Sequence, residues 1–235
     1  MALKGQGVLG IWHGIPAEAE TEYWRWHDRE HVPERVGVPG FLRGRRYRHA
    51  LIPLRYLDFY EVESFETLGS APYLARLNDP TAWTRKVVPF FRDTARFGFR
   101  VVATEGLGQG GLLVTARVRP ARPPTAAPGP PPARLAAEVR RLAGDPAALL
   151  GIHILETVAE VTRIPTAERR LRNQQVAEPD VEPEPWLLLA EVTDAATAGE
   201  VRDAALGPEG LRALGLEPDG AVVDTFRLQL TMDPG

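Results

Sequence analysis

The chain has 235 residues, a formal net charge of −3 and no cysteine. The missing thiols exclude disulfides, thiolate metal sites and a cysteine nucleophile, and the acidic balance gives no electrostatic basis for binding nucleic acid. No apolar run reaches the ~18 residues of a membrane-spanning helix, and the start, MALKGQGVLGIW, lacks the apolar core of a signal peptide. We therefore expect a cytoplasmic protein without nucleic-acid or membrane partners.

The first half of the chain predicts the order strand, helix, strand, strand, helices, strand. The stretches with strand-like composition are 7–15, 41–52, 54–62 and 96–104. A helix is expected from Pro16 to about His31, because proline suits the first helical turn. Ser64 and Asp79 are expected to cap two shorter helices. The second of these helices carries an apolar stripe of Trp83, Val87, Phe90 and Phe91.

The second half repeats this order. Its predicted strands are 110–119, 148–158, 185–192 and 221–232. Helices are expected at 133–143 and after Asp194, which is placed as an N-cap. The segment GLGQGG (106–111) predicts a flexible joint, and the proline-rich stretches 119–135 and 174–185 predict loops.

Three pairs of short segments match in the same order in both halves: PGFLRG with PAALLG, YEVES with AEVTD, and FRVVAT with FRLQLT. Such matches at corresponding places indicate a tandem duplication. Each half then reads as a βαββαβ ferredoxin-like unit, an antiparallel sheet with helices on one face. The predicted fold class is α+β, with units at 1–106 and 107–235 whose sheets pack into one pseudo-dimeric α+β barrel. We expect the first unit to carry the site.

The helix at 16–31 places an unusual set of side chains towards the sheet. At 100° per residue, Trp24, His27 and His31 share the inward stripe, whereas Trp26 and Arg29 lie away from it. Leucine or valine would stabilise such a stripe more and would need no hydrogen-bond partners. The histidines therefore suggest a function.

Three interpretations of the histidines remain open. They could cap the C-terminal end of the helix, where an imidazolium suits the macrodipole. The spacing H-x-x-E-H also matches an inverted zinc motif, but no third ligand stands out and a five-letter pattern matches easily by chance. The third interpretation is acid/base chemistry, because imidazole titrates near neutral pH.

The strand after the helix offers further candidates. In FLRGRRYRH the residues alternate, so that Arg45 and Tyr47 share one face and Arg46 lies on the other. Tyr47 could donate to a developing oxyanion, and the arginines could bind an anionic substrate or simply be solvated. At the end of the first strand, Trp12 and His13 face opposite ways, so only one of them can line a given cavity.

The segment EYWRWHDREHVPERVGVPGFLRGRRY (22–47), followed by YLDFYEVES (56–64), resembles the EthD-like branch of the dimeric α+β barrel superfamily. The resemblance covers most of residues 7–105. It implies a barrel of two ferredoxin-like units and a cavity between helices and sheet, where relatives use a histidine or tyrosine for proton transfer. Those relatives include cofactor-independent monooxygenases, polyketide cyclases, isomerases, dehydratases and haem-binding enzymes. The second unit departs from the pattern, since its first helix, ARLAAEVRRLA, has neither histidine nor tryptophan.

These observations together predict a cofactor-independent enzyme acting on a small aromatic or polyketide-like molecule by cyclisation, dehydration, isomerisation or related oxygenation. His31 is the expected general base and His27 the second choice, with Asp28 or Glu30 orienting the imidazole and Tyr47 polarising an oxygen. The expected substrate contacts are Trp12, His13, Trp24 and Arg45. The alternatives are a haem-binding protein with an axial histidine and a non-catalytic binding or assembly protein. A monomeric pseudo-dimer and a homodimer both fit the sequence.

Overall fold

The computed structural model describes residues 3–121, 132–172 and 186–235. Over these residues the chain forms eight strands: β1 Gly7–Gly14, β2 Phe41–His49, β3 Arg55–Val62, β4 Arg92–Gly106, β5 Leu112–Pro120, β6 Leu149–Thr157, β7 Trp186–Val192 and β8 Leu216–Met232. They are hydrogen-bonded in the order β1-β3-β2-β8-β5-β7-β6-β4, which closes into a barrel. The paired strands are antiparallel, so the predicted α+β class is confirmed.

The chain divides into two compact units. The N-unit comprises Lys4–Arg100, Val158–Asp180 and Leu228–Gly235, and the C-unit comprises Met1–Leu3, Val101–Thr157 and Val181–Arg227. Part of the predicted loop 119–135, residues 122–131, and all of the loop predicted at 174–185 lie outside the described residues. Among the described helices, none is long and apolar enough to cross a membrane.

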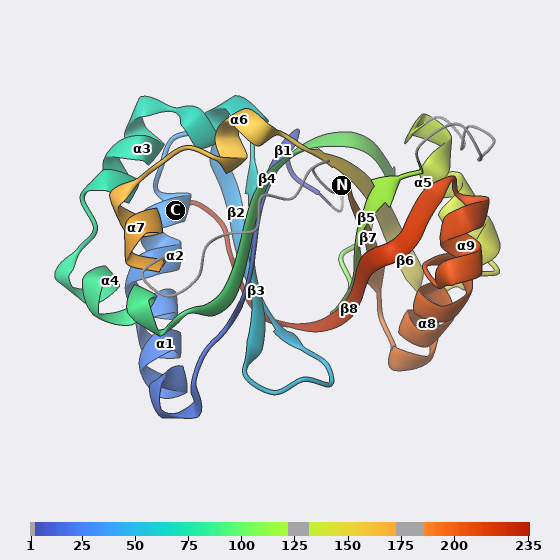
Figure 1. Cartoon of the computed structure of the whole chain (residues 1–235), viewed down its shortest axis with the longest axis horizontal. Helices are drawn as coiled ribbons and strands as arrows, with labels where there is room; N and C mark the ends of the chain where they lie inside the picture. Colours follow the sequence, from blue (N-terminus) through green and yellow to red (C-terminus); the bar gives the residue numbers. More distant parts are fainter. Residues whose placement is uncertain (1–2, 122–131, 173–185) are drawn as a thin grey trace. The chain divides into compact units, whose positions relative to one another are not determined.

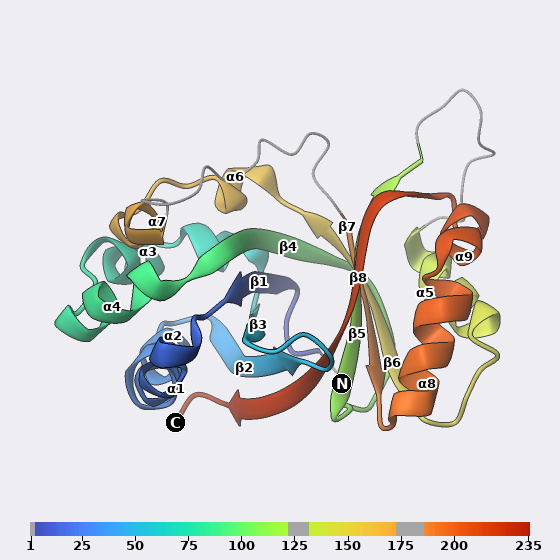
Figure 2. The ribbon, with the colours of Figure 1, turned by 60° about the horizontal axis from the view of Figure 1, so that its bottom comes forward.

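The N-unit is a sheet of β4-β1-β3-β2 with helices over one face (Figures 1 and 2). Its helical elements are Ala17–Ala19, α1 Glu20–Trp26, a π-helical turn His27–His31, α2 Val32–Val36, Phe65–Gly69, α3 Ala71–Asn78, α4 Ala82–Val87, Val88–Phe90, α6 Ala159–Thr162 and α7 Ala167–Arg172. The last two come from the second half of the sequence, yet they lie beside α3 over the N-unit sheet. Strands β1 and β3 are buried on both faces nearly throughout.

The first helix runs further than the sequence predicts. It continues through Pro33 to Val36 instead of ending near His31. The π-helical turn explains the difference, because Val32 N–H bonds to the carbonyl of His27, five residues earlier. The wider hydrogen-bonding register lets the chain enter a new first turn at Pro33, where proline's missing N–H costs nothing.

The cap predicted at Asp79 is wrong. Thr81 caps α4, its hydroxyl accepting from Thr84 N–H at 3.0 Å. An additional helix, α3, precedes it and is capped by Ser70. In the C-unit the cap predicted at Asp194 is confirmed, since its carboxylate accepts from the N–H of Thr197 at 2.9 Å.

The C-unit repeats the βαββαβ order with an aliphatic core. Its helical elements are α5 Pro132–Leu142, α8 Ala195–Glu200, a π-helical turn Val201–Ala205 and α9 Pro208–Ala213. Strand register confirms one sequence match: Phe99 is paired with Val8 in the N-unit, and Phe226 with Leu113 at the corresponding place in the C-unit.

Another match is displaced by one residue. Glu61 faces Arg43 across the β2–β3 pair, and Glu191 faces Gly151 across the β6–β7 pair, each just after a bulge. Gly151 therefore corresponds to Arg43 and not, as the sequence match implies, to Gly44. The residue opposite the glutamate is arginine in the N-unit and glycine in the C-unit, so the repeats have diverged at this position.

Candidate functional site

The N-unit buries a carboxylate among histidine and tyrosine side chains. Asp58, on β3, is 1% exposed. Its Oδ1 accepts a hydrogen bond from the hydroxyl of Tyr23 at 2.8 Å, and its Oδ2 lies 3.0 Å from His13 Nε2. His27 Nε2, from the π-helical turn, lies 3.2 Å from Oδ1. Strands β1 and β3 and helix α1 thus converge on one anion.

The surroundings of Asp58 keep it ionised. Burial alone would raise the pKa of the Asp58 carboxyl, but the facing His27 and His13 hold that pKa well below its usual range. Burial in turn lowers the pKa of His27, against the pull of Asp58. His27 Nδ1 faces Arg46 Nη1 at 3.4 Å, a donor only. A neutral His27 therefore carries its proton on Nε2, the nitrogen that faces Asp58.

His31 and His13 each retain an open, buried Nδ1 in this region. The His31 ring lies 4.2 Å from the ring of Trp26 and 5.7 Å from that of His27. His31 Nδ1 is buried and has no hydrogen-bond partner among the described residues. Burial, followed by the positive charge of Arg35, lowers the pKa of His31 well below the ordinary value. The side chain is therefore neutral at pH 7, and its Nε2–H tautomer carries a lone pair on the buried Nδ1.

Aromatic rings enclose the other side of the cluster. His13 stacks on Phe91, with ring centroids 4.0 Å apart, and is also stacked with Tyr56 at 5.8 Å. Phe91 meets Trp26 edge-on at 6.2 Å. The histidines are thus held between flat apolar surfaces, which restricts their rotation.

Tyr47, Arg45 and Trp12 lie on the other face of the sheet. The Tyr47 hydroxyl accepts a 2.6 Å hydrogen bond from Arg45, and Arg45 is paired with Glu61 at 2.8 Å. The Trp12 ring packs edge-on against two phenylalanines of β4. Strand alternation separates these groups from the histidines. The expectation that the β2 strand brings Tyr47 close to His31 is therefore wrong.

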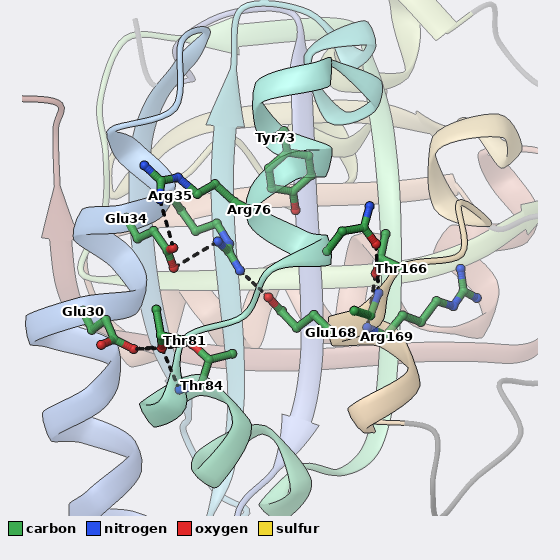
Figure 3. A network of polar contacts seen from close by, with 12 residues as sticks. Glu30, Glu34, Arg35, Tyr73, Arg76, Thr81, Thr84, Thr166, Glu168 and Arg169 are labelled. Carbon is green, nitrogen blue, oxygen red and sulfur yellow. Dashed lines mark hydrogen bonds and ion pairs between the residues drawn. The ribbon is translucent and has the colours of Figure 1, made fainter.

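The acidic residues of the helix do not contact the histidines directly. Glu30 accepts hydrogen bonds from Thr81 and Thr84 (Figure 3). Asp28 forms an ion pair with Arg46, which also faces His27 and donates to Gln229. The expected role of orienting an imidazole thus falls geometrically to Asp58, which the sequence interpretation overlooked.

The helical wheel misplaced the aromatic residues of α1. Trp26 is fully buried and donates to Thr84, whereas Trp24 is only partly buried and donates to Tyr56. Trp26 lies one helical turn after Tyr23 on a face that contacts Thr84 of α4, so a wheel drawn for the sheet side alone missed it. A signal for Asp58 was present: in YLDFYEV it shares one strand face with Tyr56 and Tyr60, an unusual place for a carboxylate.

A second buried ionic network joins α2 to α7 (Figure 3). Glu168 binds Arg35 through one carboxylate oxygen and Arg172 through the other. Arg35 also contacts Glu34, at 3.3 Å. The second half of the sequence thereby supplies side chains beside His31, since both guanidinium charges act on its imidazole.

The described residues form no group of metal ligands, and two of the cluster's histidines direct Nε2 at a carboxylate. Among the described residues, no group of three histidine, aspartate or glutamate side chains converges as an ion site. An axial haem ligand must present a ring nitrogen to iron. His13 and His27 instead turn Nε2 to Asp58, and His49 Nδ1 accepts backbone N–H groups at 2.8 and 3.1 Å.

No family model matches the sequence, and none of the curated proteins matches it either. Solved structures do match. An anthrone oxidase-like protein superposes with a TM-score of 0.60 at 9% identity, covering 100% of this chain and 96% of that one. A candidate monooxygenase from Fusobacterium nucleatum gives 0.55 at 9% identity, with coverages of 99% and 97%. One from Lactobacillus acidophilus gives 0.50 at 8% identity, with 98% and 97%.

The chain has the dimeric α+β barrel fold. At such low identity the likeness establishes the fold alone, so the chemistry of this α+β barrel has to be argued from its own residues. The residues that carry chemistry are the Asp58 cluster and the neutral His31 beside it.

Proposed function

We propose that this α+β barrel is a small-molecule enzyme that removes a proton from a carbon acid of aromatic or polyketide type, with His31 as general base and without a metal or organic cofactor. The observation that carries the proposal is the buried, unpartnered Nδ1 of a neutral His31. A general base needs an unprotonated lone pair that no protein group occupies. The names of the structural neighbours, anthrone oxidase-like and candidate monooxygenase, are in keeping with this chemistry.

In the proposed step a C–H bond next to a carbonyl breaks, its proton passes to His31 Nδ1, and its electron pair moves into an enolate. The low pKa of His31 makes it a weak base before substrate binds. The forming enolate offsets this, because a nearby negative charge raises the pKa of an imidazolium. Return of the proton to another carbon gives isomerisation. Attack of the enolate carbon on a second carbonyl of the substrate, whose oxygen then takes the proton, gives cyclisation. Departure of a β-hydroxyl group with that proton, as water, gives dehydration.

In this proposal, Asp58 and the side chains around it act by holding the histidines in place. Asp58 fixes His27 as the Nε2–H tautomer and holds it 5.7 Å, ring to ring, from His31. The buried Trp26 packs its ring 4.2 Å from the ring of His31 and so limits the rotation of that imidazole. Residues 27 and 31 thereby have different roles: His27 is a positioning residue, and His31 takes the proton.

Hydrogen–deuterium exchange tests the proposal without knowledge of the final product. Anthrone, whose methylene is acidic, is incubated with the protein in D2O, and exchange above the buffer rate is followed by NMR. His31→Gln should reduce the enzymatic exchange rate at least about a hundredfold, within the usual range of general-base catalysis. His49→Gln is the matched control, at a histidine whose Nδ1 accepts from the backbone N–H groups of Leu51 and Ile52.

Full exchange in both His31→Gln and His27→Gln would overturn the proposal and favour a non-catalytic binding protein. Far-ultraviolet circular dichroism and the melting temperature of each variant show that lost exchange is not lost folding. A Soret band after haem addition, absent from the His31→Gln variant, would likewise contradict the proposal.

A further inference from the structure

Arginine side chains gather beside the histidines, between β4 and α7 in the N-unit. Arg96 is only 8% exposed, and Arg172 likewise. Arg169, on the same helix as Arg172, is half-buried and donates to the carbonyl of Thr162 at 2.8 Å. The same carbonyl oxygen lies 3.5 Å from Arg96 Nη1. Two guanidinium groups therefore converge on one neutral acceptor.

Arg96 meets no carboxylate among the described residues. Besides the Thr162 carbonyl, its guanidinium contacts the hydroxyl of Tyr73, at 3.4 Å. Both contacts are long for a charged donor, which normally approaches its acceptor to 2.7–2.9 Å. The positive charge of Arg96 is therefore poorly compensated in a buried position.

Arg172 is only partly compensated. Its Nη2 binds Glu168, but that carboxylate also serves the buried Arg35. Arg172 Nε is buried and has no hydrogen-bond partner among the described residues. Its guanidinium lies over the ring of Phe91, 5.5 Å from the centroid.

Burying a guanidinium without a matching anion is costly, so such a group normally has a charged partner. Among the described residues, Arg172 shares Glu168 with Arg35, and no carboxylate faces Arg96. The positive charges also repel one another: burial, and then the charges of Arg96 and Arg172, lowers the pKa of Arg169. An anion bound here would remove the imbalance.

We propose that Arg96 and Arg172 bind a carboxylate of the substrate, so that the molecule acted on by His31 is an aromatic acid. That the bound anion belongs to a substrate rests on the function proposed above, whereas the anion site itself rests only on the arginines. A carboxylate suits the site because its two oxygens match the planar fork of a guanidinium. Phe91 connects the two regions, since it contacts Arg172 on one side and meets Trp26 edge-on beside the His31 ring.

Calorimetric titration with 2-naphthoate and with its neutral isostere 2-naphthamide tests this site. The wild-type protein should bind the acid at least about tenfold more tightly than the amide. Arg96→Gln and Arg172→Gln should each reduce affinity for the acid about tenfold, as expected for one charge-assisted hydrogen bond, and leave the amide unaffected. Arg76→Gln is the control, because Arg76 is 59% exposed and pairs with Glu34 at a distance of 3.7 Å.

Equal affinity of the wild type for acid and amide would overturn the proposal, as would an equal loss in the Arg76→Gln control. If the glutamine variants do not fold, Arg172→Lys keeps the charge without the fork, and an affinity identical to wild type would contradict bidentate recognition. Displacement of naphthoate by inorganic phosphate but not by acetate would reject the carboxylate class. The assay measures binding and not turnover, so its result is independent of proton exchange by His31.

Discussion

Replacing Asp58 by asparagine tests whether the histidine cluster is organised by a buried negative charge. The substitution keeps the shape of the side chain but removes the charge and one acceptor. Asp58 receives a 2.8 Å hydrogen bond from Tyr23 and lies 3.0 and 3.2 Å from the Nε2 atoms of His13 and His27. In the variant, the amide group of asparagine must face one of these donors, so a buried N–H is left without an acceptor.

The expected loss of stability in Asp58→Asn follows from the burial of the Asp58 carboxylate. Removing one member of a buried, hydrogen-bonded ionic cluster costs about 3–5 kcal/mol. For a chain of this length, each kcal/mol lowers the melting temperature by roughly 2–4 °C. We therefore expect Asp58→Asn to melt about 10 °C below the wild type at pH 7.

Calorimetry and urea denaturation at pH 7 measure this effect. The control is Asp233→Asn, because Asp233 is 56% exposed and pairs with the exposed Lys4. A surface pair of this kind contributes at most ~1 kcal/mol. Equal melting temperatures for Asp58→Asn and the control would refute the view that Asp58 is the organising charge.

Three further predictions concern the same unit. Burial lowers the folded-state pKa of His27 and His31, so the unfolded chain takes up protons first as the pH falls. Stability should therefore fall below pH ~6.5, by at most about 1.4 kcal/mol per pH unit for each imidazole. Urea denaturation of the wild type and of the His31→Gln variant measures this slope, which should be smaller in the variant. Gly98→Ala should cost about 1–3 kcal/mol by overpacking, because a Cβ there would lie 2.6 Å from Val161 Cγ2 on α6. Glu168→Gln should cost about 3–5 kcal/mol in the same assay, because it leaves two buried guanidinium groups without their carboxylate.

Each of these predictions has a matched control. His49→Gln should leave the pH dependence unchanged. Gly111→Ala should cost little beside Gly98→Ala, since a Cβ at Gly111 would meet nothing within 4 Å. Glu138→Gln removes an exposed pair with Arg141 and should change stability by less than ~1 kcal/mol. A pH slope identical in the wild type and His31→Gln, or effects no larger than those of the controls, would contradict the respective reasoning.

Local pattern in the sequence determined the order of elements and the duplication. Strand alternation and the Asp194 cap depend on neighbouring residues. Phe99 and Phe226 occupy corresponding positions in the strand register of the two units, as the matching segments imply. The same pattern placed His27 and His31 on the buried face of the first helix. These features follow from periodicity and short-range hydrogen bonds, which a sequence displays directly.

The tertiary structure alone decided which groups meet. It placed Asp58 against His27, put Tyr47 on the opposite face of the sheet, and brought Glu168 to Arg35 across 133 residues of chain. Contact with Thr84 of α4 likewise buried Trp26, which the helical wheel places away from the sheet. Ion pairs and ring contacts between distant residues depend on how elements pack and on which charge finds a partner when water is removed, and neither is encoded in a local repeat.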